Sequence, residues 1–86
     1  QIISNRQLKM SLPVLYHTDG CHLCEQAMAL LVQCQVDYVL VDIISEQHLV
    51  DSFGIRIPVL ENAKGQHLDW PFTLSQIEQF LSPNKE

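Results

Sequence analysis

The chain has 86 residues, which is the size of one small domain. Its formal net charge is −5 and its five Lys and Arg residues form no cluster, so we exclude nucleic acid and anionic membrane surfaces as partners. The longest wholly apolar run, residues 27–32, is too short to span a bilayer.

The N-terminal residues differ in character from the rest of the chain. Residues 1–9 precede Met10 and lack an apolar segment of signal-peptide length, so we expect a disordered extension followed by a single domain over residues 10–86. Three cysteines are an odd number, which does not suit the disulfide scaffold of an exported protein. We therefore predict a cytoplasmic protein.

The first half of the chain predicts a strand, a helix and a second strand. Residues 12–17 form a short apolar run before the turn residues Asp19 and Gly20, as in a buried strand. Residues 23–34 have the apolar spacing of an amphipathic helix, carried by Ala27, Leu30, Leu31 and Cys34. Residues 36–44 are rich in β-branched side chains and predict the second strand.

The second half predicts a short helix, a hairpin and a last helix. Ser45 is a suitable cap for the short helix, and Gly54 suits its C-terminal end. Residues 55–60 and 66–70 predict two strands joined by a turn over residues 62–65. Thr73 and Gln76 have the spacing of a capping box for the last helix.

The element order is therefore β-α-β-α-β-β-α. A strand, a crossover helix and a further strand predict a right-handed βαβ unit with parallel strands. The later hairpin adds an antiparallel pair. We expect an α/β fold with a four-stranded mixed sheet and helices on both of its faces.

The most informative motif is Cys21-His22-Leu23-Cys24, which lies between the first strand and the first helix. The partial positive charge of a helix N-terminus lowers the pKa of the first thiol, and the thiolate is the form that attacks disulfides. Redox chemistry is the leading interpretation of this pair. Metal binding and two inert thiols are the alternatives.

These features resemble a glutaredoxin, in the minimal thioredoxin fold. The resemblance covers residues 12–81 and includes Ile57-Pro58 before the third strand. More narrowly, the chain resembles small bacterial glutaredoxin-like proteins of unassigned role. Those proteins share an aromatic-His-x-x-x-Cys-x-Leu-Cys start, here residues 16–24, and a Leu-x-Trp-Pro-Phe segment, here residues 68–72.

The resemblance implies a thiol–disulfide oxidoreductase that acts in electron transport on a protein or small disulfide. It assigns Cys21 as the nucleophile and Cys24 as the resolving thiol. Pro58 matches the cis-proline of the family, and the backbone of Ile57 would pair with an incoming substrate strand. His22 and Leu23, which lie between the cysteines, complete the expected substrate-binding residues.

Several positions depart from glutaredoxins that use glutathione. His22-Leu23 replaces Pro-Tyr, Asp19 stands where a basic residue is usual, and residues 69–72 replace a glycine pair and an acid. Arg56 is the one cation that could compensate for the acidic net charge. We expect the protein to act without a cofactor and as a monomer. We expect its partner to be a disulfide-containing protein or another small thiol, in place of glutathione.

Two other functions stay open. The first is a metal or iron–sulfur module. Cys21, Cys24, His17 and His22 could supply ligands for zinc, although no second ligand pair is present, and Cys21 could hold an iron–sulfur cluster between two subunits. The second is a redox-inert thioredoxin-fold adaptor.

Four residues outside the motif have structural expectations. We expect Cys34 to be a buried apolar residue, because it lies on the apolar face of the first helix. Trp70 is expected to pack at the sheet edge, and His48 and His67 are expected on the surface.

Overall fold

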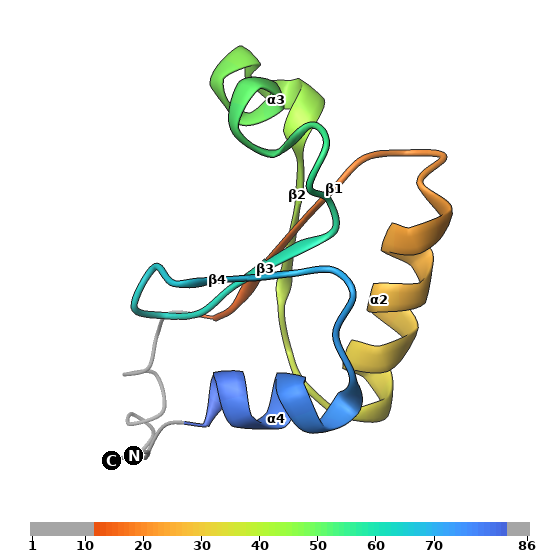
Figure 1. The fold of residues 1–86 in the computed structure, drawn as a ribbon, viewed down its shortest axis with the longest axis vertical. Helices are drawn as coiled ribbons and strands as arrows, with labels where there is room; N and C mark the ends of the chain where they lie inside the picture. Colours follow the sequence, from red (N-terminus) through yellow and green to blue (C-terminus); the bar gives the residue numbers. More distant parts are fainter. Residues whose placement is uncertain (1–11, 83–86) are drawn as a thin grey trace, which may run out of the picture.

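The computed structural model describes residues 12–82 and contains all seven predicted elements in the predicted order (Figure 1). The expected N-terminal extension, residues 1–9, lies outside the described residues. A short 3-10 helix, η1, adds one element between the second strand and the second helix. The elements are β1 (Val14–His17), α2 (His22–Gln33), β2 (Val39–Asp42), η1 (Ile43–Ser45), α3 (Gln47–Phe53), β3 (Val59–Glu61), β4 (His67–Asp69) and α4 (Leu74–Leu81).

The four strands form one mixed sheet in the order β2-β1-β3-β4. β1 and β2 are parallel, as the βαβ prediction requires, and β3 is antiparallel to both β1 and β4. Tyr16 lies opposite Val59, and Val59 lies opposite Asp69. The α/β fold with a four-stranded mixed sheet, as in a minimal thioredoxin fold, is confirmed.

The two buried clusters lie on opposite faces of the sheet, because successive side chains of a strand point to opposite faces. Leu60 belongs to a buried cluster with α2 and α4, and its neighbour Val59 belongs to a second cluster with α3. In Figure 1, α2 and α4 flank the sheet, and α3 lies beyond one end of the strands. The first cluster consists of Leu15, Ala27, Leu31, Leu60, Phe72 and Ile77, and the second of Ile43, Phe53 and Val59.

The end of α2 explains why β2 begins three residues later than predicted. Gln35 adopts a left-handed conformation with φ of 60°. Its N–H donates to Val32 O, and the N–H of Val36 donates to Leu31 O. These two bonds are the Schellman arrangement, which closes a helix C-terminus. Val36 therefore belongs to the helix cap, and the strand begins only at Val39.

The start of α3 differs from the prediction at the cap. Glu46, and not Ser45, is the N-cap residue, and its side chain makes no capping hydrogen bond. Ser45 lies in η1, which is itself capped by the side chain of Asp42.

The turn after α3 explains why β3 begins later in the chain than predicted. The helix ends at Gly54, where a Cβ would lie 2.6 Å from Val50 O, so a larger residue would clash there. The N–H groups of Arg56 and Ile57 both donate to Phe53 O. They continue the turn after α3, so β3 begins at Val59 and not at residue 55.

The last part of the chain follows the sequence prediction closely. The turn over residues 62–65 is closed by a hydrogen bond from Gly65 N to Asn62 O, and Gly65 has a φ of 81°. The capping box of α4 is present, with Thr73 and Gln76 bonding reciprocally. Within residues 12–82, none of the helices is long and apolar enough to cross a membrane.

Candidate functional site

Cys21 and Cys24 form a disulfide at the start of α2. Their Cα atoms lie 5.2 Å apart, within the range that a disulfide requires. The two sulfurs differ in access, because Cys21 is half-buried and Cys24 is 0% exposed. One residue of the pair can therefore meet a partner, whereas the other is held inside the fold.

Cys21 is itself the N-cap of α2. Its Sγ accepts a hydrogen bond of 3.1 Å from Cys24 N, and its carbonyl accepts one from Glu25 N. Gly20, with a φ of 77°, turns the chain into the helix just before this cap. The sulfur of Cys21 thus lies where backbone N–H groups carry partial positive charge, which favours an anionic sulfur.

The sheet brings the other predicted site residues to the same end as the cysteines. Tyr16 pairs with Val59, so the end of β1 and the start of β3 are neighbours, and residues 18–20 connect β1 to Cys21. The bond between Ile57 and Pro58 is cis, in agreement with the resemblance, and Pro58 is buried. Trp70 N donates to Pro58 O over 3.2 Å, so the end of β4 lies next to Pro58.

The backbone of Ile57 is only partly available to a partner. Its N–H already donates to Phe53 O over 3.1 Å, so an incoming strand could use its carbonyl but not its N–H. The two residues between the cysteines are open. The side chain of His22 is 84% exposed and lies 4.0 Å from a Glu25 oxygen, and Leu23 is also exposed.

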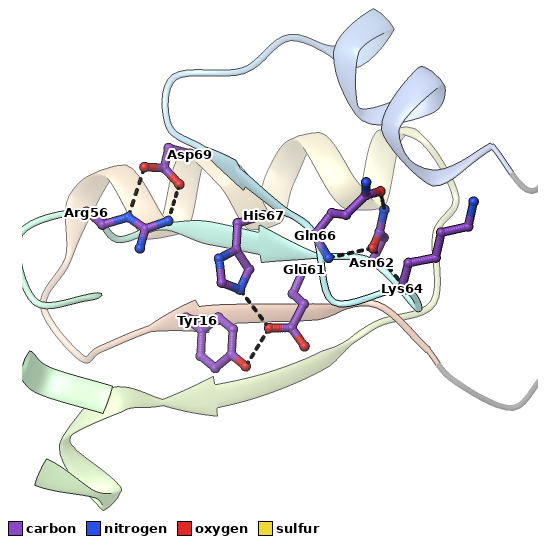
Figure 2. A network of polar contacts seen from close by, with 8 residues as sticks. All are labelled: Tyr16, Arg56, Glu61, Asn62, Lys64, Gln66, His67 and Asp69. Atoms are coloured by element: carbon purple, nitrogen blue, oxygen red, sulfur yellow. Dashed lines mark hydrogen bonds and ion pairs between the residues drawn. The ribbon is translucent and has the colours of Figure 1, made fainter. Parts of the chain in front are cut away.

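Arg56, the cation that could attract an anionic thiol, is held by Asp69 (Figure 2). Its Nη2 donates to Oδ1 over 2.8 Å and its Nε donates to Oδ2 over 3.0 Å. Its guanidinium also lies 5.1 Å from the centre of the Phe53 ring. The hydrogen bond from Arg56 lowers the pKa of Asp69 below its ordinary value and raises that of Arg56.

A second polar group, which the sequence analysis missed, joins three strands. Tyr16 donates to Glu61 Oε1 over 3.0 Å, and His67 Nε2 lies 3.0 Å from the same oxygen (Figure 2). The ring of Phe53 stacks on Tyr16 and meets the edge of His67. Burial, followed by Glu61, raises the pKa of Tyr16. His67 is exposed, as expected, and its side chain also takes part in this group.

The structure also gives the surroundings of Cys34, Trp70 and His48. Cys34 is half-buried against the first cluster, and burial, with a smaller contribution from Glu78, raises the pKa of its thiol. Trp70 packs against Phe72 with the rings nearly perpendicular, in agreement with the packing role that we expected. His48 is exposed on α3, where its Nδ1 lies 3.2 Å from Glu46 Oε1.

The zinc alternative is not supported by the arrangement of side chains. Within the described residues, no group of three or more His, Cys, Asp and Glu side chains is placed to hold a metal ion. His17 and His22 thus do not form a ligand set with the two cysteines.

Comparisons with known proteins agree with this fold. A family model described as glutaredoxin-like domain (DUF836) matches residues 14–82. The crystal structure of target protein XcR50 from X. campestris is 35% identical, with a TM-score of 0.78, and the match covers 85% of this chain and 99% of that chain. The solution structure of protein Ne2328 from Nitrosomonas europaea is 27% identical, with a TM-score of 0.66, and the match covers 83% of this chain and 91% of that chain. The curated proteins gave no match.

Proposed function

The chain belongs to the glutaredoxin-like domain family, and on that premise we propose that it is a thiol–disulfide oxidoreductase. Cys21 is the attacking thiolate and Cys24 is the resolving thiol. The observation that carries this proposal is the difference in solvent access between Cys21 and Cys24. Cys21 is accessible at the N-cap of α2, whereas Cys24 is fully buried behind it.

The proposed reaction begins with the reduced pair and a disulfide R–S–S–R. The Cys21 thiolate attacks one sulfur, the S–S bond breaks, and R–S⁻ leaves and takes up a proton. Cys24 loses its proton and attacks the Cys21 sulfur of the mixed disulfide, which releases the second thiol. Two electrons pass from the pair to the substrate, and the Cys21–Cys24 disulfide remains. A dithiol reductant returns the pair to its starting state.

Partner and location belong to the same proposal. The partner is a disulfide-containing protein or a small disulfide, and the reaction takes place in the cytoplasm, whose reducing conditions supply the dithiol reductant that regenerates the pair. Leu23, the carbonyl of Ile57 and the surface around Pro58 are the contacts that we assign to the substrate. His22, whose side chain is 84% exposed, contacts it from the start of α2. The protein acts as a monomer and without a cofactor.

The reduction potential of the pair is the first test. The protein is equilibrated in glutathione or dithiothreitol buffers, and the oxidised fraction is read by mass spectrometry. A potential between about −270 and −180 mV, the span of thioredoxin to protein disulfide isomerase, is expected. A pair that does not form the disulfide, or one whose potential lies far outside this span, contradicts an exchange role.

Single-cysteine variants then separate the two roles. Cys21→Ser should abolish reduction of a model disulfide, because no accessible thiolate remains. Cys24→Ser should accumulate mixed disulfides at Cys21, because the resolving thiol is gone. Cys34→Ser is the matched control and should keep the parent rate. A Cys21→Ser protein that still reduced the disulfide at the parent rate would show that the mechanism is wrong.

A further inference from the structure

The ion pair between Arg56 and Asp69 has a two-point geometry that occupies most of one edge of the guanidinium. Nε and Nη2 of Arg56 each donate to a different oxygen of Asp69. The Phe53 ring lies against the guanidinium at 5.1 Å. A planar fork of this kind is the arrangement by which arginine binds carboxylates, and here the carboxylate belongs to the chain itself.

This pair lies at the end of the sheet where the cysteines are. Asp69 is opposite Val59, the residue after Pro58, and Val59 is opposite Tyr16 near the end of β1. Arg56 lies two residues before Pro58. The pair is also accessible to solvent, since the side chains of Arg56 and Asp69 are 35% and 46% exposed. A charged disulfide that approaches Cys21 therefore reaches the end of the sheet where this pair lies.

No other described Lys or Arg lies at this end of the sheet. Within residues 12–82, the two Lys and Arg residues are Arg56 and Lys64. Lys64 lies at the tip of the β3–β4 hairpin, and β3 ends there beside Val14, at the start of β1. Asp19 and Glu25 lie within four residues of Cys21. With Arg56 paired, the remaining Asp, Glu, Lys and Arg side chains described near Cys21 are acidic.

We propose that Asp69 is a specificity-determining residue, which holds Arg56 away from anionic disulfides and so makes the Cys21–Cys24 pair prefer neutral and cationic ones. This inference rests on the proposed function. The chemical step is the exchange given above, and only the encounter with the substrate differs. Charges of one sign near a reactive group slow the approach of like-charged partners, and the effect weakens with salt.

The test compares three disulfides of different charge at low ionic strength. Glutathione disulfide is anionic, hydroxyethyl disulfide is neutral and cystamine is cationic. In Asp69→Asn, we expect the rate with glutathione disulfide, relative to the neutral one, to rise about two- to fivefold, the scale of an exposed charge interaction. The relative rate with cystamine should fall. Both changes should disappear at high salt, which a purely structural effect would not do.

Three further variants keep the test specific. Asp37→Asn removes the same charge in the loop before β2, at the opposite end of the sheet, and should change the ratio less than Asp69→Asn does. Adding Arg56→Gln to Asp69→Asn should abolish the gain. Arg56→Gln alone leaves the charge of Asp69 unpaired and should lower the ratio, so this arm decides if Asp69→Asn does not fold.

The outcomes separate the two proposals. If the unaltered chain does not exchange with the neutral disulfide, the proposed function fails, and this inference fails with it. If the chain exchanges with the neutral disulfide but Asp69→Asn and Asp37→Asn give the same ratio, the inference alone is overturned. A gain in the ratio that depends on Arg56 and on low salt supports it.

Discussion

At the scale of residues, Tyr16 makes the free energy of unfolding depend on pH in the alkaline range. Burial is the main cause that raises its pKa above the ordinary value of 10.0, and the hydrogen bond to Glu61 adds to it. The folded chain therefore keeps this proton to a higher pH than the unfolded chain does. Once the pH passes the unfolded value, the unfolded state binds fewer protons, so the free energy of unfolding must fall as pH rises further.

Ultraviolet absorbance of tyrosinate checks this prediction. The titration of Tyr16→Phe, subtracted from that of the unaltered chain, should give a single transition with a midpoint above 10.0. Glu61→Gln should move this midpoint down only in part, because burial, the larger cause, remains. A midpoint at or below the ordinary value would contradict the contacts of Tyr16 with Glu61 and Phe53.

The site residues differ in how far the sequence could predict them. The helix start that carries Cys21 and Cys24 was predictable, because it follows from local signals: a short apolar strand before the motif and an amphipathic stretch after it. Arg56 and Asp69 are thirteen residues apart, and their pairing depends on where β3 begins, which the turn after α3 displaces. His67 was predictable in part, since it flanks the turn over residues 62–65 opposite Glu61.

At the scale of elements, the same distinction holds between local signals and tertiary ones. The capping box of α4 and the hairpin turn depend on side chains a few residues apart, and both were predicted. The late start of β2 was not, because Gln35 adopts a conformation that usually requires glycine. A strand pattern rich in β-branched residues cannot reveal that its first members close the preceding helix.

Gln35 therefore offers a test of the helix cap. Gln35→Gly should raise the free energy of unfolding by up to about 1 kcal/mol, because it relieves a left-handed conformation at the C-terminal cap of α2. Gln33→Gly, within the last turn of α2, should instead lower it by about 1 kcal/mol, since glycine disfavours a helix interior. Urea unfolding of the two variants measures both changes. Equal destabilisation by both glycines would show that the cap does not have this geometry.

At the scale of the whole molecule, the two buried clusters stabilise the fold, whereas the excess of acidic side chains opposes folding. One cluster packs α2 and α4 against the sheet, and the other joins Phe53 of α3 to Val59, whose side chain points to the opposite face. The excess of acidic over basic residues within residues 12–82 can be read from the sequence alone. Of the ten Asp and Glu residues all but Glu86 lie within residues 12–82, whereas of the five Lys and Arg residues only Arg56 and Lys64 do.

This imbalance predicts that moderate salt stabilises the fold. Folding brings the carboxylates closer together than they are in the unfolded chain, so their mutual repulsion opposes folding. Raising the NaCl concentration from about 0.01 M to about 0.15 M shortens the Debye length from about 30 Å to about 8 Å and screens that repulsion. The same salt weakens the pair of Arg56 with Asp69, but one exposed pair is a smaller contribution than many repelling carboxylates. We expect the free energy of unfolding, measured with urea at neutral pH, to rise by about 0.5 kcal/mol. A fall over this range would mean that ion pairs, and not repulsion, dominate the electrostatics of this fold.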